Sequence, residues 1–283
     1  MENKINRMKE LLAIMKKEEL AYYLNDDPIV SDREWDSQFD ELAALEKETG
    51  IIYASSPTQK VGGGILPSLP KVIHSKPMLS AAKTKSTEDI DKFAGKGPGD
   101  CMVSWKLDGL TLVIRYANGK LERIITRGDG NIGEDVTHNC ASILGIPQYI
   151  PCTDDVEVRG ECVVSWAGFD EVNKRVDEPY AHPRGLAAGS VRLLNQRESA
   201  PRELQFVAFE LVQPFLSTVE NSYAFLAEQG FSVVPHLLTK TPGQVIDDKL
   251  FDVKTFPLPA DGLIVEYNDK AVSYTHLTLP TNS

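Results

Sequence analysis

The chain has 283 residues, of which 42% are hydrophobic and 25% charged, so it can bury a full core and is not a disordered polypeptide. Its formal net charge of -11 argues against a domain that binds a nucleic-acid backbone by itself, because such binding depends on clustered Lys and Arg. No apolar run is long enough to cross a bilayer, and we expect a cytoplasmic protein. The four cysteines show no C-x-x-C spacing, so neither a zinc site nor a disulfide framework is expected.

The first fifty residues have helical patterning. Apolar residues recur at helical spacing over residues 5–15. After a break at "NDDP", Ser31 and Glu34 have the spacing of a capping box that opens a second helix, and Gly50 ends it. We therefore expect a small all-helical module over residues 1–55.

The remainder of the chain is patterned as strands with interspersed helices. Gly, Pro and Ser are dense over residues 56–80, which we interpret as a linker. Asn118-Gly119 lies between two apolar runs and predicts a tight hairpin. Further strands are expected at 101–107, 156–164, 204–212 and 261–267, and helices at 86–93, 133–144, 166–176, 185–195 and 221–230. This pattern predicts an α+β domain built on antiparallel sheet over residues 81–270.

Lys106 lies near the end of one of these strands, in "SWKLDG". Most lysines in such a position lay their stem on apolar surface and keep the ammonium in water. The alternative is a nucleophile, which must be neutral to attack and therefore needs desolvation or nearby positive charge. Ser104-Trp105 and Leu107 would supply apolar walls, Asp108 could orient a substrate hydroxyl, and Gly109 lets the backbone pass close to a ligand.

Five ordered motifs decide between these interpretations. They are K-x-D-G at 106–109, then "TRGDGNIGEDVTHN", "VEVRGE", "AHPRGLAAGSVRLLN" and "DGLIVEYND". In this order they resemble the adenylation region of the bacterial NAD-dependent DNA ligases, an antiparallel-sheet nucleotidyltransferase domain with an ATP-grasp-like ligase fold. In front of them, "AYYLNDDPIVSDREWD" resembles the small helical module of the NAD-using branch, and "SSPTQKVGG" with "MLS" resembles its linker. The resemblance covers roughly residues 5 to 270.

The resemblance implies a reaction in three steps. Lys106 attacks the α-phosphorus of NAD, which forms lysyl-AMP and expels nicotinamide mononucleotide. The adenylate passes to the 5′-phosphate of nicked double-stranded DNA, and the 3′-hydroxyl then displaces AMP. Charge builds on phosphoryl oxygens throughout, so arginines and Mg²⁺ are expected to assist. NAD and Mg²⁺ are thus the implied cofactors, and a monomer is the implied oligomeric state.

The same resemblance assigns the site residue by residue. Asp108 and Asp261 join Lys106 as catalytic residues, and Asp261 supports the metal or the protonation state of the lysine. Glu161 is expected to meet the ribose, and the arginines expected at the phosphates are Arg127, Arg184 and Arg192. The remaining expected nucleotide contacts in this region are Ser80, Ala81, Ser104 and Glu266. No separate set of protein metal ligands is expected.

The front module is expected to bind the nicotinamide mononucleotide half of NAD. Tyr22, Tyr23 and Trp35 offer flat faces for the nicotinamide ring. Asp32 and Asp36 are one helical turn apart and can accept hydrogen bonds from its amide or ribose. The alternative is that Trp35 packs into the helical core while Asp32 only stabilises the start of a helix.

Three departures from the family pattern stand out. Ser104 replaces the glutamate that usually contacts adenine, and Glu266 stands where a lysine commonly contacts the adenylate phosphate. The next lysine-bearing motif is missing, and residues 271–283 are expected to be a non-native or disordered tail. The family's later DNA-binding domains do not fit within 283 residues. We therefore expect this chain alone to adenylate itself but to seal nicks poorly.

Two alternatives remain open. An ATP- or GTP-dependent nucleotidyltransferase shares K-x-D-G but lacks the aromatic and acidic front module, and cofactor preference distinguishes it. A catalytically impaired NAD-binding remnant of a ligase would bind NAD without a covalent product. A phosphate-binding loop is rejected because neither "VGGGILPS" nor "GKGPGD" fits G-x-x-x-x-G-K-[ST].

Overall fold

The computed structural model contains two compact units. The first comprises residues 1–80 and 127–135, and the second comprises residues 81–126 and 136–283. Each unit is described separately below. The structure describes residues 3–4, 7–8, 10–12, 14–15, 18, 30–49, 56–59, 69–78, 82–84, 86–193, 202–248, 251–272 and 277–280.

The first unit is helical in its N-terminal part. Helix α2 (Asp32–Thr49) is followed by the short 3-10 helix η1 (Pro57–Gln59). The capping box is confirmed: the Ser31 N–H donates to Glu34 Oε2 (2.9 Å), and the Glu34 N–H donates to Ser31 Oγ (3.3 Å). The N–H and hydroxyl of Ser31 lower the pKa of the Glu34 carboxyl. The buried core of this part is Met8, Leu11, Met15 and Leu42, flanked by Leu12, Trp35, Phe39 and Leu45.

A two-stranded ribbon completes the first unit. Strand β1 (Lys71–Ile73) pairs antiparallel with β6 (Ile132–Glu134), so that Val72 lies opposite Gly133. The helix expected over 133–144 is therefore wrong. Residues of that range instead form the end of β6, the 3-10 helix η2 (Thr137–Ser142) and strand β7 (Ile143–Leu144). The partner strand of β6 is some sixty residues earlier in the chain, and local patterning cannot reveal such a pairing.

The second unit contains two five-stranded sheets. One has the order β10-β3-β11-β12-β2, formed by His236–Thr239, Cys101–Leu107, Ala260–Tyr267, Leu277–Pro280 and Ala82–Lys83. The other has the order β5-β4-β8-β9-β7, formed by Lys120–Thr126, Leu110–Ala117, Val156–Val163, Leu204–Gln213 and β7. All neighbours are antiparallel except the pairs β12–β2 and β7–β9. The predicted α+β class with antiparallel sheet is confirmed.

The predicted hairpin is confirmed as the turn between β4 and β5. Asn118 and Gly119 have φ of 51° and 73°, the positive values that a tight two-residue turn requires. Of the expected tail, residues 277–280 form β12, which lies between β11 and β2.

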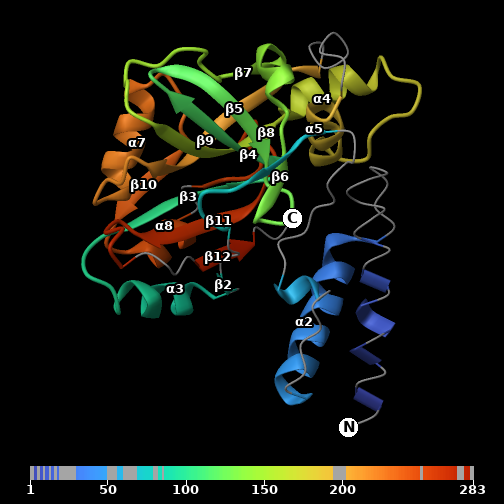
Figure 1. Ribbon diagram of the computed structural model, residues 1–283. Helices are drawn as coiled ribbons and strands as arrows, with labels where there is room; N and C mark the ends of the chain where they lie inside the picture. The colour runs from blue at the N-terminus through green and yellow to red at the C-terminus, as the bar shows by residue number, and fades with distance from the viewer. Residues whose placement is uncertain are drawn as a thin grey trace. The chain divides into compact units, whose positions relative to one another are not determined.

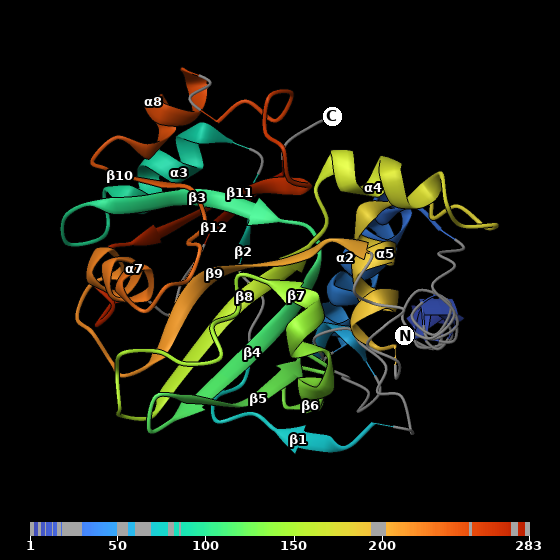
Figure 2. The ribbon, with the colours of Figure 1, turned by 90° about the horizontal axis from the view of Figure 1, so that it is seen from above.

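Helices cover the sheets of the second unit in separate groups (Figure 1). Helices α3 (Thr87–Ala94) and α8 (Pro242–Asp247) pack against each other, and Figure 2 shows both beside the β3–β11 sheet, on the side away from the second sheet. Helix α7 (Val219–Glu228) packs on β9. Helix α4 (Trp166–Asn173) contacts α5 (Pro183–Val191), which packs on β4 and β8. Helix α5 thus begins two residues before the expected range and ends at Val191. None of the described helices is long and apolar enough to span a membrane.

The chain passes from one sheet to the other at Asp108-Gly109. Strand β3 ends at Leu107 in the first sheet, and β4 begins at Leu110 in the second. Every residue of β8, the neighbour of β4, is buried. The crossover thus follows a strand that pairs with the fully buried β8, and it places "KLDG" where the two sheets meet.

Candidate active site

Lys106 stands opposite a break in the register of β11. In β11, Gly262 lies opposite Lys106. The next pair joins Ala260 to Leu107, which leaves Asp261 as an extra residue, a β-bulge. The bulge turns the Asp261 carboxylate toward Lys106, whose Nζ donates a hydrogen bond to Oδ2 in an ion pair. The two side chains keep 36% and 40% of their surface exposed, so a ligand can reach the amine.

The second oxygen of Asp261 offers a position for a cation. Its Oδ1 is buried and has no hydrogen-bond partner among the described residues. Within that same part of the chain, no three His, Cys, Asp or Glu side chains gather into a metal site. This donor set fits Mg²⁺, which keeps several waters and usually takes one or two carboxylates together with substrate phosphates.

The expected apolar walls around the lysine are not formed by Trp105. Successive side chains of a strand point to opposite faces, so Trp105 and Lys106 point away from each other. Trp105 is buried and stacks on Phe256 with a centroid distance of 4.4 Å and an interplanar angle of 12°, and Phe251 meets it edge-on. Trp105 is therefore part of the packing behind the strand, and it stiffens the element that carries the lysine.

Glu161 of β8 holds the crossover between the sheets. Its Oε1 accepts a hydrogen bond from the Gly109 N–H (3.1 Å), and its Oε2 accepts one from Thr111 Oγ1 (2.9 Å). The side chain is buried. A Cβ at Gly109 would lie 2.2 Å from the carbonyl oxygen of Cys162, so only glycine allows this close approach of backbones.

The start of α5 contacts Asp108 through two side chains. Arg184 donates from Nη1 to Asp108 Oδ1 (3.1 Å), and Nδ1 of His182 lies 3.7 Å from Oδ2. His182 is the N-cap of α5, and Pro183 follows at the first helical position, where its missing N–H costs nothing. A guanidinium and a carboxylate thus meet at the crossover, two residues along the chain from Lys106, and such groups suit a phosphate and a sugar hydroxyl.

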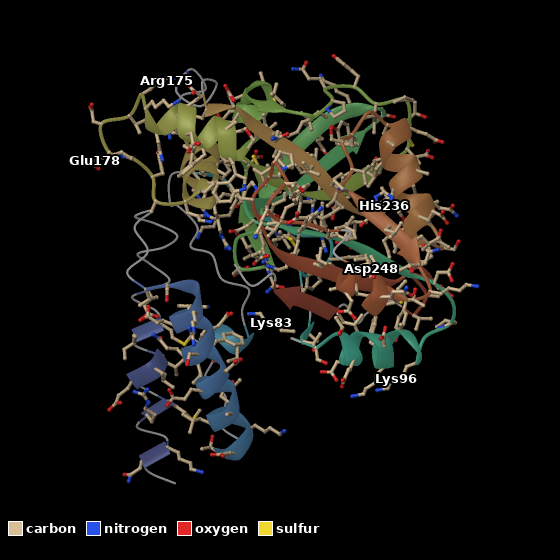
Figure 3. All side chains as sticks on the ribbon, turned by 180° about the vertical axis from the view of Figure 1, so that it is seen from behind. Lys83, Lys96, Arg175, Glu178, His236 and Asp248 are labelled. Carbon is tan, nitrogen blue, oxygen red and sulfur yellow. The ribbon has the colours of Figure 1, made fainter. Side chains whose placement is uncertain are left out.

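Further along β3 and β11 lies a row of buried polar groups on the face that carries Lys106. Ser104 of β3, Glu266 of β11 and Tyr223 of α7 are all buried. Burial raises the pKa of the Tyr223 phenol well above its ordinary value, and the carboxylate of Glu266 adds to the effect. His236, labelled in Figure 3, lies opposite Ser104 on the edge strand β10 with its ring 4.5 Å from that of Tyr223.

Two family models match the chain. Residues 66–276 match the model of the NAD-dependent DNA ligase adenylation domain, and residues 1–62 match that of the DNA ligase-like, N-terminal NAD⁺-binding domain. The chain belongs to the NAD-dependent DNA ligase family.

Curated relatives of this ligase family agree with the models. The DNA ligase of Lachnoclostridium phytofermentans is 37% identical over 280 residues, which is 96% of this chain and 43% of that protein. The DNA ligase of Ruminiclostridium cellulolyticum is 35% identical, over 96% of this chain and 42% of that protein. The chain thus spans about two fifths of the length of these relatives. An archaeal ATP-dependent RNA ligase structure aligns at 15% identity and a TM-score of 0.47, over 86% of this chain and 64% of that one.

The structure brings together one part of the site predicted from the sequence. Lys106, Asp108, Glu161, Arg184 and Asp261 form the contacts described above, and Ser104 and Glu266 lie along the same strands. Arg192 is the half-buried C-cap of α5.

The other predicted residues lie in the first unit or outside the described residues. Arg127 belongs to the first unit, as do Asp32, Trp35 and Asp36 of α2. Trp35 is partly buried against the helical core, and Asp36 is exposed. Outside the described residues lie Tyr22, Tyr23, Ser80 and Ala81.

Four residues near the candidate site were not singled out from the sequence. They are Thr111, Trp166, His182 and Tyr223. A signal for His182 was present, because a polar residue before a proline that opens a helix is a typical N-cap position. Thr111 and Tyr223 come close to the site through sheet and helix packing, which sequence spacing does not report.

Proposed function

We propose that this chain transfers AMP from NAD to Lys106 as the adenylation region of an NAD-dependent DNA ligase. The observation that carries the proposal is the contact of Lys106 with Asp261 across the β11 bulge. A bulge that turns a carboxylate onto a partly exposed lysine has no use in the packing of the sheet. It fits an amine that must be held in place and relieved of a proton.

The first chemical step needs only groups of this chain and NAD. The lone pair of Lys106 Nζ forms a bond to the α-phosphorus, and the bond from that phosphorus to the bridging oxygen breaks. The electron pair leaves with nicotinamide mononucleotide, whose phosphate carries the charge. Before the attack, the ammonium gives one proton to Oδ2 of Asp261, the acceptor that Nζ already contacts, and this frees the lone pair. After the bond to phosphorus has formed, the nitrogen loses a second proton to the phosphate of the departing mononucleotide or to water.

The surrounding side chains position the nucleotide. Arg184 can hold a phosphate oxygen in its planar fork while it remains bonded to Asp108. Asp108 and Glu161 offer acceptors for sugar hydroxyls beside the crossover. Mg²⁺, which Asp261 Oδ1 can help to hold, supplies charge neutralisation at the phosphates when it is bound.

We further propose that residues 1–55 are the module that binds nicotinamide mononucleotide, that 56–80 are a linker and that 81–270 are the adenylation domain. In the first of these, Tyr22, Tyr23 and Trp35 stack on the nicotinamide ring, and Asp32 and Asp36 accept hydrogen bonds from it. The match of residues 1–62 to an NAD⁺-binding family model supports this assignment.

The substrate that receives the adenylate is, in this proposal, nicked double-stranded DNA. The names of the curated relatives support it, since they are DNA ligases. We propose a cytoplasmic monomer that adenylates itself and seals nicks poorly alone, because its charge of -11 is unfavourable for holding a polyanion. Efficient sealing of a nicked duplex by this chain would refute that limit.

Intact-mass analysis tests the proposal. The protein is incubated with Mg²⁺ and either NAD or ATP, beside the variants Lys106→Ala, Asp261→Asn and Lys120→Ala. Lys120 is a matched control because it is an exposed strand lysine outside the site. We expect an AMP adduct with NAD only, its loss in Lys106→Ala, a rate lower by about 100-fold in Asp261→Asn, and no change in Lys120→Ala.

Other outcomes identify the alternatives. An adduct with ATP instead of NAD would indicate an ATP-type nucleotidyltransferase. NAD binding without an adduct would indicate a ligase remnant, a candidate favoured by the buried carboxylate of Glu266 in the row that leads to Lys106.

A further inference from the structure

One atom of His182 faces two different partners. Nδ1 accepts a hydrogen bond from the Arg184 N–H (3.3 Å), which caps α5, and it lies 3.7 Å from Oδ2 of Asp108. The other carboxylate oxygen of Asp108 accepts from Arg184 Nη1 (3.1 Å). Both oxygens of one carboxylate thus lie against the first residues of one helix.

The two contacts of Nδ1 exclude each other chemically. To accept from the Arg184 N–H, Nδ1 must carry a lone pair, which is the case in a neutral imidazole with its proton on Nε2. Once protonated, Nδ1 is a donor and has no lone pair left for the N–H. The carboxylate of Asp108 is then the acceptor within reach. Protonation of His182 therefore removes the hydrogen bond from the Arg184 N–H that caps α5 and allows a hydrogen bond from Nδ1 to Asp108 Oδ2.

The surroundings allow this exchange to occur in the folded protein. The His182 side chain is 50% exposed and can trade protons with water, whereas that of Asp108 is 9% exposed. From α4, the uncharged ring of Trp166 meets the imidazole edge-on at 5.9 Å between centroids. Among the described residues, the charged group that faces His182 is the carboxylate of Asp108 from the crossover, 3.7 Å away. From α5 itself the contact is the backbone N–H of Arg184, whose guanidinium is bonded to the other oxygen of Asp108.

We propose that His182 is a positioning residue whose protonation controls the availability of Asp108 Oδ2. With His182 neutral, Oδ2 is open to a hydroxyl of the nucleotide sugar and the start of α5 is capped. With His182 charged, Oδ2 accepts from the imidazolium and the backbone N–H of Arg184 loses its acceptor. Nucleotide binding is therefore weaker in the charged state. This inference rests on the proposed NAD-binding function of the same site.

The first test compares the Kd for NAD at about pH 6 and about pH 8, where histidine changes its charge. It uses the wild-type chain, His182→Asn and His138→Asn. Asparagine is a good N-cap but does not titrate, so it separates capping from charge. His138 is a control because its Nε2 contacts the carbonyl of Leu193 and not Asp108.

In the wild-type chain and His138→Asn, binding weakens by about 2- to 10-fold at the lower pH, the equivalent of one hydrogen bond. In His182→Asn that difference disappears. A purely structural role would leave the pH dependence of the variant equal to that of the wild type, and this result would overturn the proposal.

The second test needs no ligand. The ring nitrogens of His182 are observed by NMR in the wild-type chain at about pH 8 and about pH 6. At the higher pH we expect the ring proton on Nε2, because Nδ1 accepts from the Arg184 N–H, and at the lower pH a proton on both nitrogens and the loss of that backbone hydrogen bond. A proton on Nδ1 at about pH 8 would refute the exchange. If no NAD binding is found at any pH, the proposed function fails, while this measurement still decides the role of His182.

Discussion

Replacing Glu161 by alanine measures how strongly the crossover between the sheets is held. The buried carboxylate accepts from the Gly109 N–H (3.1 Å) and from Thr111 Oγ1 (2.9 Å). Hydrogen bonds to charged groups contribute about 1.5–3 kcal/mol each, and a buried donor left without an acceptor costs about 1–3 kcal/mol. Because the Gly109 N–H is enclosed by β8, we expect Glu161→Ala to lower the free energy of unfolding by about 3 kcal/mol or more.

Two milder variants calibrate this magnitude. Thr111→Val removes one of the two bonds and leaves the Gly109 N–H satisfied, so it should cost about 1–2 kcal/mol. Glu161→Gln keeps the size and shape of the side chain. Its amide oxygen can still accept from the Gly109 N–H, and its NH₂ can donate to the hydroxyl of Thr111. We expect a loss of about 1 kcal/mol, because both groups stay paired while the charge is lost.

Urea unfolding monitored by the fluorescence of Trp105 and Trp166 reports this unit, which contains both residues. Trp105 is buried on β3, the strand that enters the crossover. A Trp35→Phe background removes the signal of the helical part of the first unit. If Glu161→Ala is no more destabilising than Thr111→Val, the carboxylate does not hold the Gly109 N–H and the reasoning is wrong.

Two further predictions follow from the packing. Gly109→Ala should lower the Tm, because its Cβ would lie 2.2 Å from the Cys162 carbonyl oxygen. The control Gly95→Ala should leave the Tm nearly unchanged, because its Cβ comes only within 3.4 Å of the Asp91 carbonyl oxygen. Equal Tm values for the two variants would contradict the clash. Burial raises the pKa of the Cys101 thiol to about 11 and raises that of Cys162 even further, so in the native protein at about pH 8 a thiol reagent should label at most the two half-buried cysteines. Labelling of Cys101 or Cys162 without denaturant would show that the strands open.

The sequence predicted those parts of the fold that depend on neighbouring residues. The turn at Asn118-Gly119 follows from residues that accept positive φ, and the capping box at Ser31 and Glu34 follows from a local pair of hydrogen bonds. The helix expected over 133–144 failed because the same residues find partners elsewhere. Ile132–Glu134 pairs with β1, and Thr137 Oγ1 accepts from the Ile124 N–H.

The sequence motifs named residues that the structure brings close to one another, but they did not predict how these residues are arranged. The motif around Lys106 and the one around Asp261 point to the same chemistry, but nothing in "DGLIVEY" announces a bulge, because the bulge exists only relative to β3. The wall expected from Trp105 failed for a similar reason. Trp105 and Lys106 are adjacent in sequence, but adjacent side chains of a strand face opposite sides of the sheet.

The bulge in β11 also sets which side chains of that strand face which side. Both Asp261 and Gly262 stand against Lys106, and because one of them is glycine there is room for the other's carboxylate. Deleting Asp261 itself would leave Ala260 opposite Leu107 and Gly262 opposite Lys106, so the ladder would be even and the buried run that starts at Leu263 would stay in register. Lys106 would then face glycine in place of a carboxylate. A change of one residue could thus leave a stable fold with its lysine alone, so variation in the length of this segment is expected to act on chemistry far more than on folding.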